Sequence, residues 1–302
     1  MMLEPRAAWP SRAENRGVAR FDRALGPHDV ALTFVNHATF VVQFAGVNVL
    51  TDPVWSKRAS PVSWAGPARV RDPGVALSAL PRVDVVLLSH NHYDHLDAET
   101  LRALSSMFPK CRALVAWGNK SLVERLGFRD VHELDWWQSV RIGDDLVVTF
   151  APTQHFSGRG LFDRNRSLWG AFMLQSGSRR VYFGGDGGYC AHFAETTRRL
   201  GAPDVAMLGI GAYRPEWFMR PIHMTPADAL MAHRDLRAKQ SVAMHFGTFQ
   251  LSAEGIDQPW EELKAAMVAA AGGAGVSEDD AAFVRVDEGE TRVWPWPGGS
   301  AT

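Results

Sequence analysis

From residue 30 onward, short runs of β-branched and aromatic residues alternate with turn residues along the chain. The runs 30–35, 40–46 and 47–52 have the length and composition of strands. The run 83–89 is apolar almost throughout, which is typical of a strand buried on both faces. The same criteria predict further strands at 112–117, 146–152, 169–176, 179–185, 204–210 and 240–246.

Amphipathic segments follow both groups of strands. The segment 97–108 predicts a helix with Asp97 as its N-cap and Thr100, Leu101 and Leu104 opening its apolar face. Further helices are expected at 191–200, 225–237 and 259–271. Because strands outnumber helices and come in two batches, we expect two sheets with helices on their outer faces.

The first 28 residues differ from the rest. They are polar, Arg-rich and aperiodic, which predicts an irregular N-terminal arm that is either mobile or wrapped over the surface. Residues 29–302 are expected to form a single domain, with an irregular Pro/Gly/Ser-rich segment from 53 to 81.

Composition narrows the function classes. Of 302 residues 46% are hydrophobic, and the formal net charge of −1 gives no global field that would attract nucleic acid. Cys111 and Cys190 are the only cysteines, so there is no disulfide framework. The N-terminus has charges but no apolar core of a signal peptide, and no run reaches the length of about 18 apolar residues that spans a bilayer. We therefore expect a cytoplasmic protein without a transmembrane span.

Metal-capable side chains gather behind the predicted strands. His90, His92, Asp94 and His95 follow the run 83–89 within six positions. Three more stand at or beyond later strand ends: His155, Asp186 and His245. The i, i+2 spacing of His90 and His92 points both side chains the same way if the chain is extended there. Because strand ends of one sheet converge, these loops can meet in space.

The residue types indicate zinc chemistry. Imidazole and carboxylate oxygen are the usual zinc ligands outside thiolate sites, and a catalytic zinc keeps one position open for water. Seven ligands are too many for one tetrahedral ion but suit two ions that share a bridging carboxylate and a hydroxide. Taken singly, His155 or His245 would be read as a half-buried polar residue and Asp186 as a turn residue. Their conjunction with the His-rich loop favours a metal site.

At this level the chain resembles a known superfamily. The motif "SHNHYDHLD", followed by His155, Asp186 and His245, resembles the metallo-β-lactamase superfamily. Six further segments resemble the N-acyl-phosphatidylethanolamine-hydrolysing phospholipase D family and its bacterial relatives: "LTDPVWSKRASPVSWAGPARVR", "ELDWW", "LWGAF", "GGDGGYC", "IGAYRPEWFM" and "AMHFGTFQLS". The similarity runs from about residue 31 to 294 and implies an α/β (α+β) fold, a four-layer αβ/βα sandwich of the metallo-β-lactamase type.

The resemblance implies roles for individual residues. One zinc would be held by His90, His92 and His155, the other by Asp94, His95 and His245, and Asp186 would bridge them; iron or manganese are alternative metals. His223 stands where the family has a further histidine close to the active site, although it could equally be a neighbour of the N-cap before the helix at Thr225. Asn36 and Gly187 stand where the family often has Gly and Thr, in loops that border the substrate.

The mechanistic hypothesis is that a zinc-bound hydroxide attacks the phosphorus of a phosphodiester in phospholipase D fashion, with Asp94 or His223 steering protons. Candidate substrate contacts are three loop arginines, which could also be merely solvated, and an apolar triplet, which could also be core: Arg159, Arg164, Arg166, Trp217, Phe218 and Met219. A lipid substrate would require peripheral contact with a membrane. The resemblance also implies a homodimer.

Three alternatives remain. A lactonase or other small-ester hydrolase would use the same metals on a smaller pocket. A nuclease of this fold usually adds a basic module, which the near-neutral charge of this chain argues against. A non-catalytic metal-binding scaffold would bind metal tightly without hydrolysing any ester.

Overall fold

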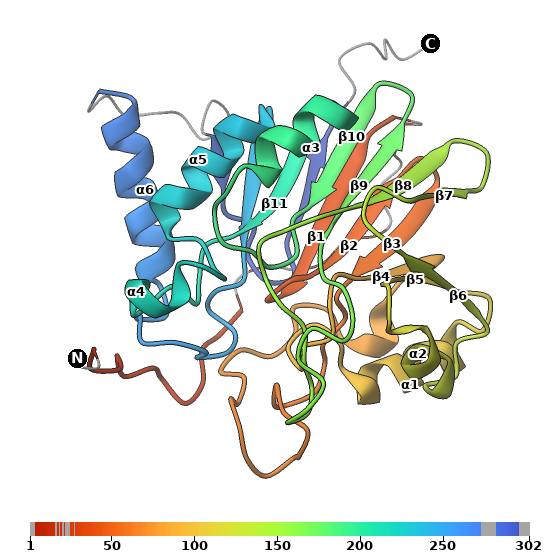
Figure 1. Ribbon diagram of the computed structural model, residues 1–302, viewed down its shortest axis with the longest axis horizontal. Helices are drawn as coiled ribbons and strands as arrows, with labels where there is room; N and C mark the ends of the chain where they lie inside the picture. Colours follow the sequence, from red (N-terminus) through yellow and green to blue (C-terminus); the bar gives the residue numbers. More distant parts are fainter. Residues whose placement is uncertain are drawn as a thin grey trace.

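Two sheets of seven strands each build the described part of the chain (Figure 1). The computed structural model describes residues 4–15, 17, 19, 21, 25–26, 28–272 and 282–295. The first sheet has, in spatial order, β14 (Thr291–Trp294), β1 (Val30–Asn36), β2 (Thr39–Phe44), β3 (Val47–Thr51), β4 (Val85–Leu88), β5 (Arg112–Ala116) and β6 (Asp130–Leu134). The second has β13 (Phe283–Val284), β12 (Gln240–Met244), β11 (Val205–Gly209), β10 (Arg179–Phe183), β9 (Ala171–Ser176), β8 (Leu146–Ala151) and β7 (Ser139–Ile142).

The two sheets pack face to face. Because alternate residues of each strand point to opposite faces, each sheet buries one face against the other sheet and the other face beneath helices. In β4, Val85 and Leu87 join the core between the sheets, whereas Val86 and Leu88 join a second core on the outer face. Phe150 and Phe172 fill the central core from the second sheet. Strands such as β1 and β12 are buried along their whole length, which explains why they read as nearly continuous apolar runs.

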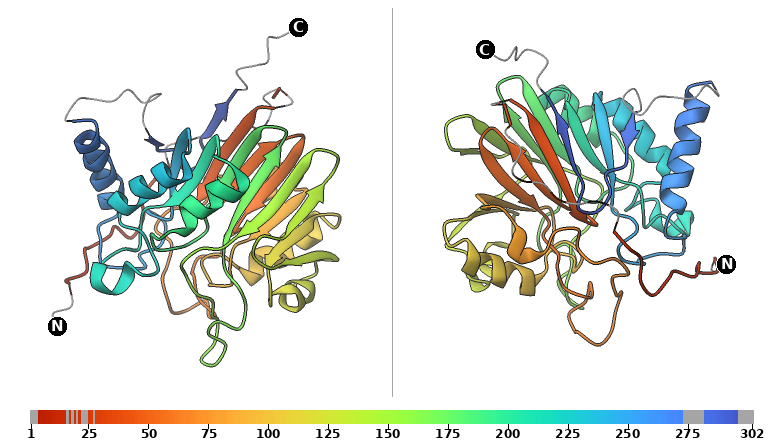
Figure 2. Two further views of the ribbon diagram at one scale, coloured as in Figure 1. Left: turned by 45° about the horizontal axis from the view of Figure 1, so that its top comes forward. Right: turned by 180° about the vertical axis from the view of Figure 1, so that it is seen from behind.

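Helices cover the two outer faces (Figure 2). On the first sheet lie α1 (Ala98–Met107) and α2 (Lys120–Arg125). On the second lie α3 (His192–Leu200) and α5 (Pro226–Leu236), with α6 (Gln258–Ala270) beside α5. Two short pieces, η1 (Leu77–Ala79) and α4 (Glu216–Met219), belong to the connecting loops. The predicted four-layer αβ/βα sandwich is therefore confirmed.

Local signals set the helix starts. Asp97 accepts a hydrogen bond from Glu99 N at the start of α1, so its predicted role as N-cap is confirmed. Thr225 begins α5 with a capping box, in which its side chain accepts from Asp228 N and Asp228 accepts from Thr225 N. The strands predicted from the sequence are all present, whereas β6, β7, β13, β14, α2 and α4 were not predicted.

Sheet topology brings particular strand ends together. In the first sheet, β1, β3 and β4 run in the same direction; in the second, β8, β10 and β12 do. The carboxyl ends of each set therefore open onto one edge of the sandwich, and the loops that follow them form the candidate site.

The described residues of the N-terminal arm lie against surface loops. Ala13 makes an isolated bridge with Arg71, Trp9 Nε1 donates to Glu254 O, and Ala7 N donates to Ala253 O at 2.8 Å. The arm therefore runs along the loops that follow β3 and β12. None of the described helices is long and apolar enough to cross a bilayer.

Candidate metal centre

Six strand ends supply the polar side chains of the centre. In the first sheet, His37 follows β1, Asp52 follows β3, and the loop from His90 to His95 follows β4. In the second sheet, His155 lies four residues beyond β8, Asp186 three beyond β10, and His245 directly after β12. The structure thus brings all seven sequence-predicted metal ligands to one edge of the sandwich.

Three histidines form a first group. His90 Nε2 lies 2.8 Å and His155 Nε2 3.2 Å from His92 Nδ1, and the ligand atoms of all three lie within 4.8 Å of one another. These are the three histidines expected to hold one ion. His90 and His155 are buried, and His92 is half-buried.

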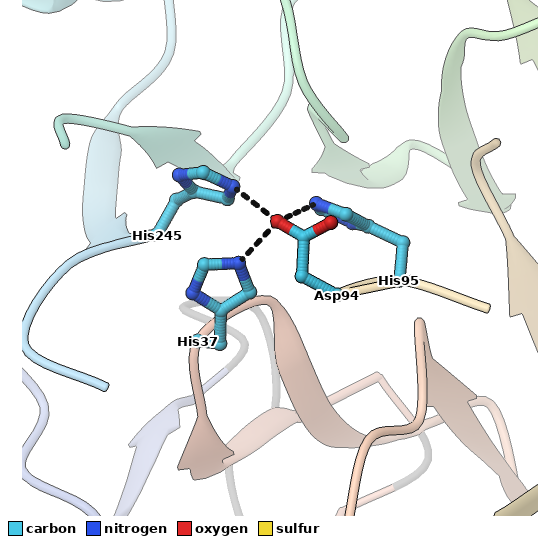
Figure 3. Close-up of side chains that lie close together, drawn as sticks. All are labelled: His37, Asp94, His95 and His245. Carbon is cyan, nitrogen blue, oxygen red and sulfur yellow. Dashed lines mark hydrogen bonds and ion pairs between the residues drawn. The ribbon is translucent and has the colours of Figure 1, made fainter. Parts of the chain in front are cut away.

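Asp94, His95 and His245 form a second group together with His37 (Figure 3). Asp94 Oδ2 lies 3.1 Å from His37 Nε2, 3.5 Å from His245 Nε2 and 3.6 Å from His95 Nε2. Figure 3 shows the three rings converging on this carboxylate from three different segments. The division of ligands between two ions that the resemblance implied corresponds to these two spatial groups.

Asp186 lies between the groups. Its Oδ2 is 3.1 Å from His245 Nε2 and 3.2 Å from His95 Nε2 on one side, and 3.7 Å from His155 Nε2 and 3.9 Å from His90 Nε2 on the other. One carboxylate oxygen therefore faces nitrogens of both groups, as a bridging ligand would. The preceding Gly185 has φ +55°, and a Cβ there would lie 2.8 Å from Ser89 Cβ, so only glycine allows this approach.

Hydrogen bonds to residues outside the two ligand groups occupy one nitrogen of each ring and so determine which nitrogen faces the centre. His95 Nδ1 donates to Asp52 Oδ2 at 2.6 Å, and His155 Nδ1 donates to Ile222 O at 2.8 Å. Ser89 gives its single hydroxyl proton to Asp52, so its oxygen accepts from His90 Nδ1 at 2.9 Å. In each of these rings Nε2 is then the nitrogen directed into the centre, the arrangement found around metal-bound histidines.

The charge state of the groups fits cations in the same way. Burial lowers the pKa of His90 and His155 well below its ordinary value, so both rings are neutral and able to bind metal. Burial acts in the same direction on His95 and His245, but the facing Asp186 and Asp94 outweigh it and raise the pKa of His95 well above its ordinary value and that of His245 to about 9, so the two carboxylates favour positive charge at these rings. Burial alone would raise the pKa of Asp94 and Asp186, but the facing histidines hold it well below the usual range. The Asp186 carboxylate is buried and that of Asp94 half-buried, and carboxylates withdrawn from solvent in this way require positive charge beside them.

Buried ring nitrogens without hydrogen-bond partners also indicate that these side chains suit a metal. Among the described residues, His95 Nε2 and both ring nitrogens of His245 are buried without a hydrogen-bond partner. Buried polar atoms are rarely left without a partner, and those that are left need an explanation. A set of imidazole and carboxylate donors without thiolate suits zinc, iron or manganese. The residues present therefore fit a pair of metal ions.

Backbone strain marks the same place. His37, Asp52 and His245 have φ of 48°, 31° and 64°, which non-glycine residues rarely adopt. His245 N donates to His37 O at 2.8 Å, so two of the strained residues hold each other. Such strain costs about 1–3 kcal/mol per residue and persists where the surroundings over-determine the conformation, which is typical of functional sites.

His223, predicted as a catalytic residue, lies at the centre and is partly exposed. Its Nδ1 is 3.9 Å from Asp186 Oδ2, and its ring packs 5.2 Å from those of His155 and His245, measured between centroids. Burial lowers its pKa to about 4, so the ring is neutral at pH 7. It also precedes the N-cap Thr225 by two residues, so both interpretations offered by the sequence describe its position.

The predicted substrate contacts divide into three kinds. Arg164 and Arg166 are exposed, with Arg164 stacked 4.2 Å from the centroid of Phe156. Arg159 is instead half-buried, and its guanidinium donates to backbone carbonyls of the His-rich loop. In the apolar triplet on α4, Trp217 and Phe218 are exposed and Met219 is half-buried, so the triplet is not part of the core.

Two polar residues of the centre were missed from the sequence, His37 and Asp52. In the structure they directly follow β1 and β3, as His245 directly follows β12, and in the sequence both stand at or just beyond the end of a predicted strand, so the rule that selected His245 would have found them. His37 stands alone in "NHAT" and Asp52 in "LTDP", without neighbouring ligands that would draw attention to them.

An αβ/βα sandwich with two His/Asp groups at one edge of its sheets defines the metal-dependent hydrolases of the metallo-β-lactamase type. Residues 47–246 match the family model described as the β-lactamase superfamily domain, and the chain belongs to this family. It is 38% identical over 274 residues to N-acyl-phosphatidylethanolamine-hydrolyzing phospholipase D 1 of Caenorhabditis elegans, covering 87% of this chain and 74% of that protein.

Two further comparisons agree. The mitochondrial N-acyl-phosphatidylethanolamine-hydrolyzing phospholipase D of Saccharomyces cerevisiae is 34% identical over 238 residues, 77% of this chain but only 50% of the yeast protein. Among solved structures, an isothiocyanate hydrolase from Delia radicum gut bacteria superposes with a TM-score of 0.68 at 22% identity, covering 88% of this chain and all of that one. The structural likeness supports the fold alone.

Proposed function

We propose that this chain is a dinuclear zinc phosphodiesterase that hydrolyses N-acyl-phosphatidylethanolamine-like lipids in the manner of a phospholipase D. The observation that carries the proposal is the position of Asp186 Oδ2, within 3.9 Å of histidine nitrogens from both ligand groups. The identity of 38% to a nematode enzyme named for this lipid supports the choice of substrate.

The residues would divide the work as follows. His90, His92 and His155 would hold one ion, Asp94, His95 and His245 the other, and Asp186 both. Bound zinc would supply Lewis acidity and lower the pKa of a water ligand to about 7. Asp94 and Asp186 together carry less charge than two divalent cations, so the loaded centre would favour an anionic phosphodiester over a neutral ester.

His223 is better suited than Asp94 to move a proton. The pKa of Asp94 is held well below its usual value because the facing histidines outweigh its burial, so Asp94 has no proton to donate. Its Oδ2 is also occupied by His37. His223 is neutral and partly exposed beside Asp186, so its unprotonated ring nitrogen could accept a proton from water and pass it to the leaving alkoxide as the lipid is cleaved.

Exposed apolar side chains support a lipid substrate. Leu161 and Phe162 are 92% and 88% exposed in the loop that follows His155, and Trp64 is 80% exposed in the loop that follows β3. These two loops project from the edge of the sandwich where the ligand-bearing strands end (Figures 1 and 2). Large apolar side chains presented to solvent beside exposed Arg164 and Arg166 suit a peripheral contact with a phospholipid surface. The homodimer implied by the resemblance stays a prediction.

A substrate comparison tests the proposal. The metal-loaded protein should release phosphatidic acid and an N-acylethanolamine from N-acyl-phosphatidylethanolamine in mixed micelles, and should also cleave bis(p-nitrophenyl) phosphate. Asp186→Asn should abolish both reactions, whereas Asp145→Asn, which changes an exposed turn, should leave them unchanged. Turnover of lactones without cleavage of the lipid would point to the lactonase alternative. Two bound metals without any ester hydrolysis would point to a binding scaffold.

A further inference from the structure

We propose that Arg159 is a positioning residue that clasps the His-rich loop to the loop carrying His155 and so maintains the geometry of the metal centre. This inference rests on the proposed metal site but assigns Arg159 a role other than substrate anchoring. We call the two segments that it joins the ligand loop (residues 90–96) and the projecting loop (residues 156–167).

The first part of the clasp is the Arg159 guanidinium. Its Nη1 donates two hydrogen bonds, to Asn91 O at 2.8 Å and to Leu96 O at 2.7 Å. These two carbonyls lie on either side of three ligands in sequence: His92, Asp94 and His95. A single nitrogen therefore fixes the distance between the two ends of the ligand loop.

Tyr93 strengthens this contact from the middle of the ligand loop. The Arg159 guanidinium carbon lies 4.0 Å from the centroid of the Tyr93 ring, and Tyr93 Oη donates to Arg159 O at 2.8 Å. The cation–π contact and the hydrogen bond hold the side chain and the backbone of Arg159 at the same time. These contacts engage both protons of Nη1 and one face of the guanidinium within the protein.

The second part of the clasp is Asn91, which stands between the ligands His90 and His92. Asn91 Nδ2 donates to Ser167 Oγ at 2.9 Å, and Gly158 N donates to Asn91 Oδ1 at 2.8 Å. One buried amide thus binds both ends of the projecting loop. The side chain of Asp163 accepts from the backbone N–H groups of Arg159 and Gly160, which fixes the turn that presents the guanidinium.

The ligand loop needs such support because it is not packed against core on every side. A pocket of about 590 Å³ lies beside Tyr93 of this loop, with Asp97 and Arg159 also in its wall. Without side chains filling that space, hydrogen bonds rather than packing must resist movement of Tyr93 and its neighbouring ligands. Small displacements of ligands weaken metal binding, and replacing residues that orient ligands typically costs roughly 10- to 100-fold in affinity.

The test compares Arg159→Met with Arg164→Met, a matched change in the same loop at an exposed position. Methionine keeps the apolar stem over Tyr93 but removes both donors. Zinc affinity, measured by competition with a chromophoric chelator, should fall roughly 10- to 100-fold in Arg159→Met and remain within about twofold in Arg164→Met. With bis(p-nitrophenyl) phosphate, kcat should fall in Arg159→Met while KM changes little, and Arg159→Lys should recover part of the affinity.

Three results would overturn the inference. Unchanged zinc affinity with a raised KM in Arg159→Met would make Arg159 a substrate anchor, and an equal loss of affinity in Arg164→Met would remove its specific role. A lowered melting temperature with unchanged zinc affinity would make the contact merely structural. If Arg159→Met does not fold, Asn91→Ala cuts the other half of the clasp and should lower zinc affinity; wild-type affinity in that variant would equally overturn the inference.

Failure of the proposed function gives a different signature. If the wild-type protein binds two zinc ions but hydrolyses no phosphodiester, the affinity measurements still test the clasp. If it binds less than one equivalent of metal, the metal site itself is refuted before any variant is compared.

Discussion

Asp52 offers the sharpest test of how the second ligand group is held together. Its side chain is completely buried and accepts three hydrogen bonds: from Ser89 N at 2.8 Å, from Ser89 Oγ at 2.5 Å and from His95 Nδ1 at 2.6 Å. In Asp52→Asn one oxygen becomes an NH₂ group. If the NH₂ group faces His95 Nδ1–H, two hydrogen-bond donors face each other. If it faces Ser89 N–H instead, two donors face each other there.

The expected magnitude follows from these contacts. A hydrogen bond to a charged group contributes about 1.5–3 kcal/mol, and loss of the one to His95 frees that ring to change tautomer or turn away. Replacing a residue that orients a metal ligand typically costs about 10- to 100-fold in affinity, which corresponds to about 1.4–2.8 kcal/mol. The two estimates agree, so we expect Asp52→Asn to lose one to two orders of magnitude in affinity for the ion held by His95.

Asp97→Asn is the matched control, assayed alongside by chelator competition and by thermal unfolding of the metal-free protein. Asp97 is also a buried carboxylate beside the ligand loop, but it accepts from Ser56 Oγ, Ser56 N and the start of α1, and within the described part of the chain no histidine donates a hydrogen bond to it. Its loss should lower the melting temperature and leave metal affinity unchanged. Wild-type affinity in Asp52→Asn, or an equal loss of affinity in both variants, would refute the reasoning.

Three further outcomes are expected. His223→Gln should lower kcat on bis(p-nitrophenyl) phosphate about 100-fold while two metals stay bound; an unchanged kcat contradicts its role in proton transfer. Replacing Leu161 and Phe162 together by Ser should lower activity on N-acyl-phosphatidylethanolamine vesicles at least about tenfold and leave the soluble substrate unaffected. Burial lowers the pKa of His192 to about 4, whereas the same group in the unfolded chain has a pKa of about 6.5. Protonation therefore favours the unfolded state, and the free energy of unfolding falls as the pH drops from about 6.5 towards 4, by about 2 kcal/mol at pH 5. Urea titrations at pH 7.5 and 5 should show a smaller acid loss in His192→Gln than in the wild type, and no such relief in the surface variant His132→Gln.

The sequence predicted the interior of both sheets and missed their edges. The four strands that were not predicted, β6, β7, β13 and β14, are the outermost strands of the two sheets. Edge strands have only one paired neighbour and are often short or carry charged residues, which weakens the apolar signal. β6 reads "DVHEL" and β7 reads "SVRI", with three residues of each exposed or half-buried, and β13 has only two residues. Central strands are recognisable in the sequence as nearly continuous apolar runs because both of their faces are buried.

The candidate ligands were predictable for a related reason. Parallel strands bring their carboxyl ends to one edge, so His155, Asp186 and His245 could be grouped with the His-rich loop without knowing the register. The direction of a loop side chain has no such rule. Arg159 and Arg164 look equivalent in "GRGLFDRNR", yet one is directed back to the ligand loop and the other lies outside on Phe156. Only tertiary contacts distinguish them.

The strained residues show how the fold and the site are connected. Glycine would adopt the positive φ of His37, Asp52 and His245 at little cost, but it has no side chain to direct into the centre. The chain retains the strained residue in each case, and each one directly follows a strand whose end directs its side chain into the centre. The hydrogen bond from His245 N to His37 O joins the two sheets at this point. The local backbone preference is therefore broken where two strand ends must face one another across the sandwich, and that requirement comes from the metal centre rather than from the stability of the sheets.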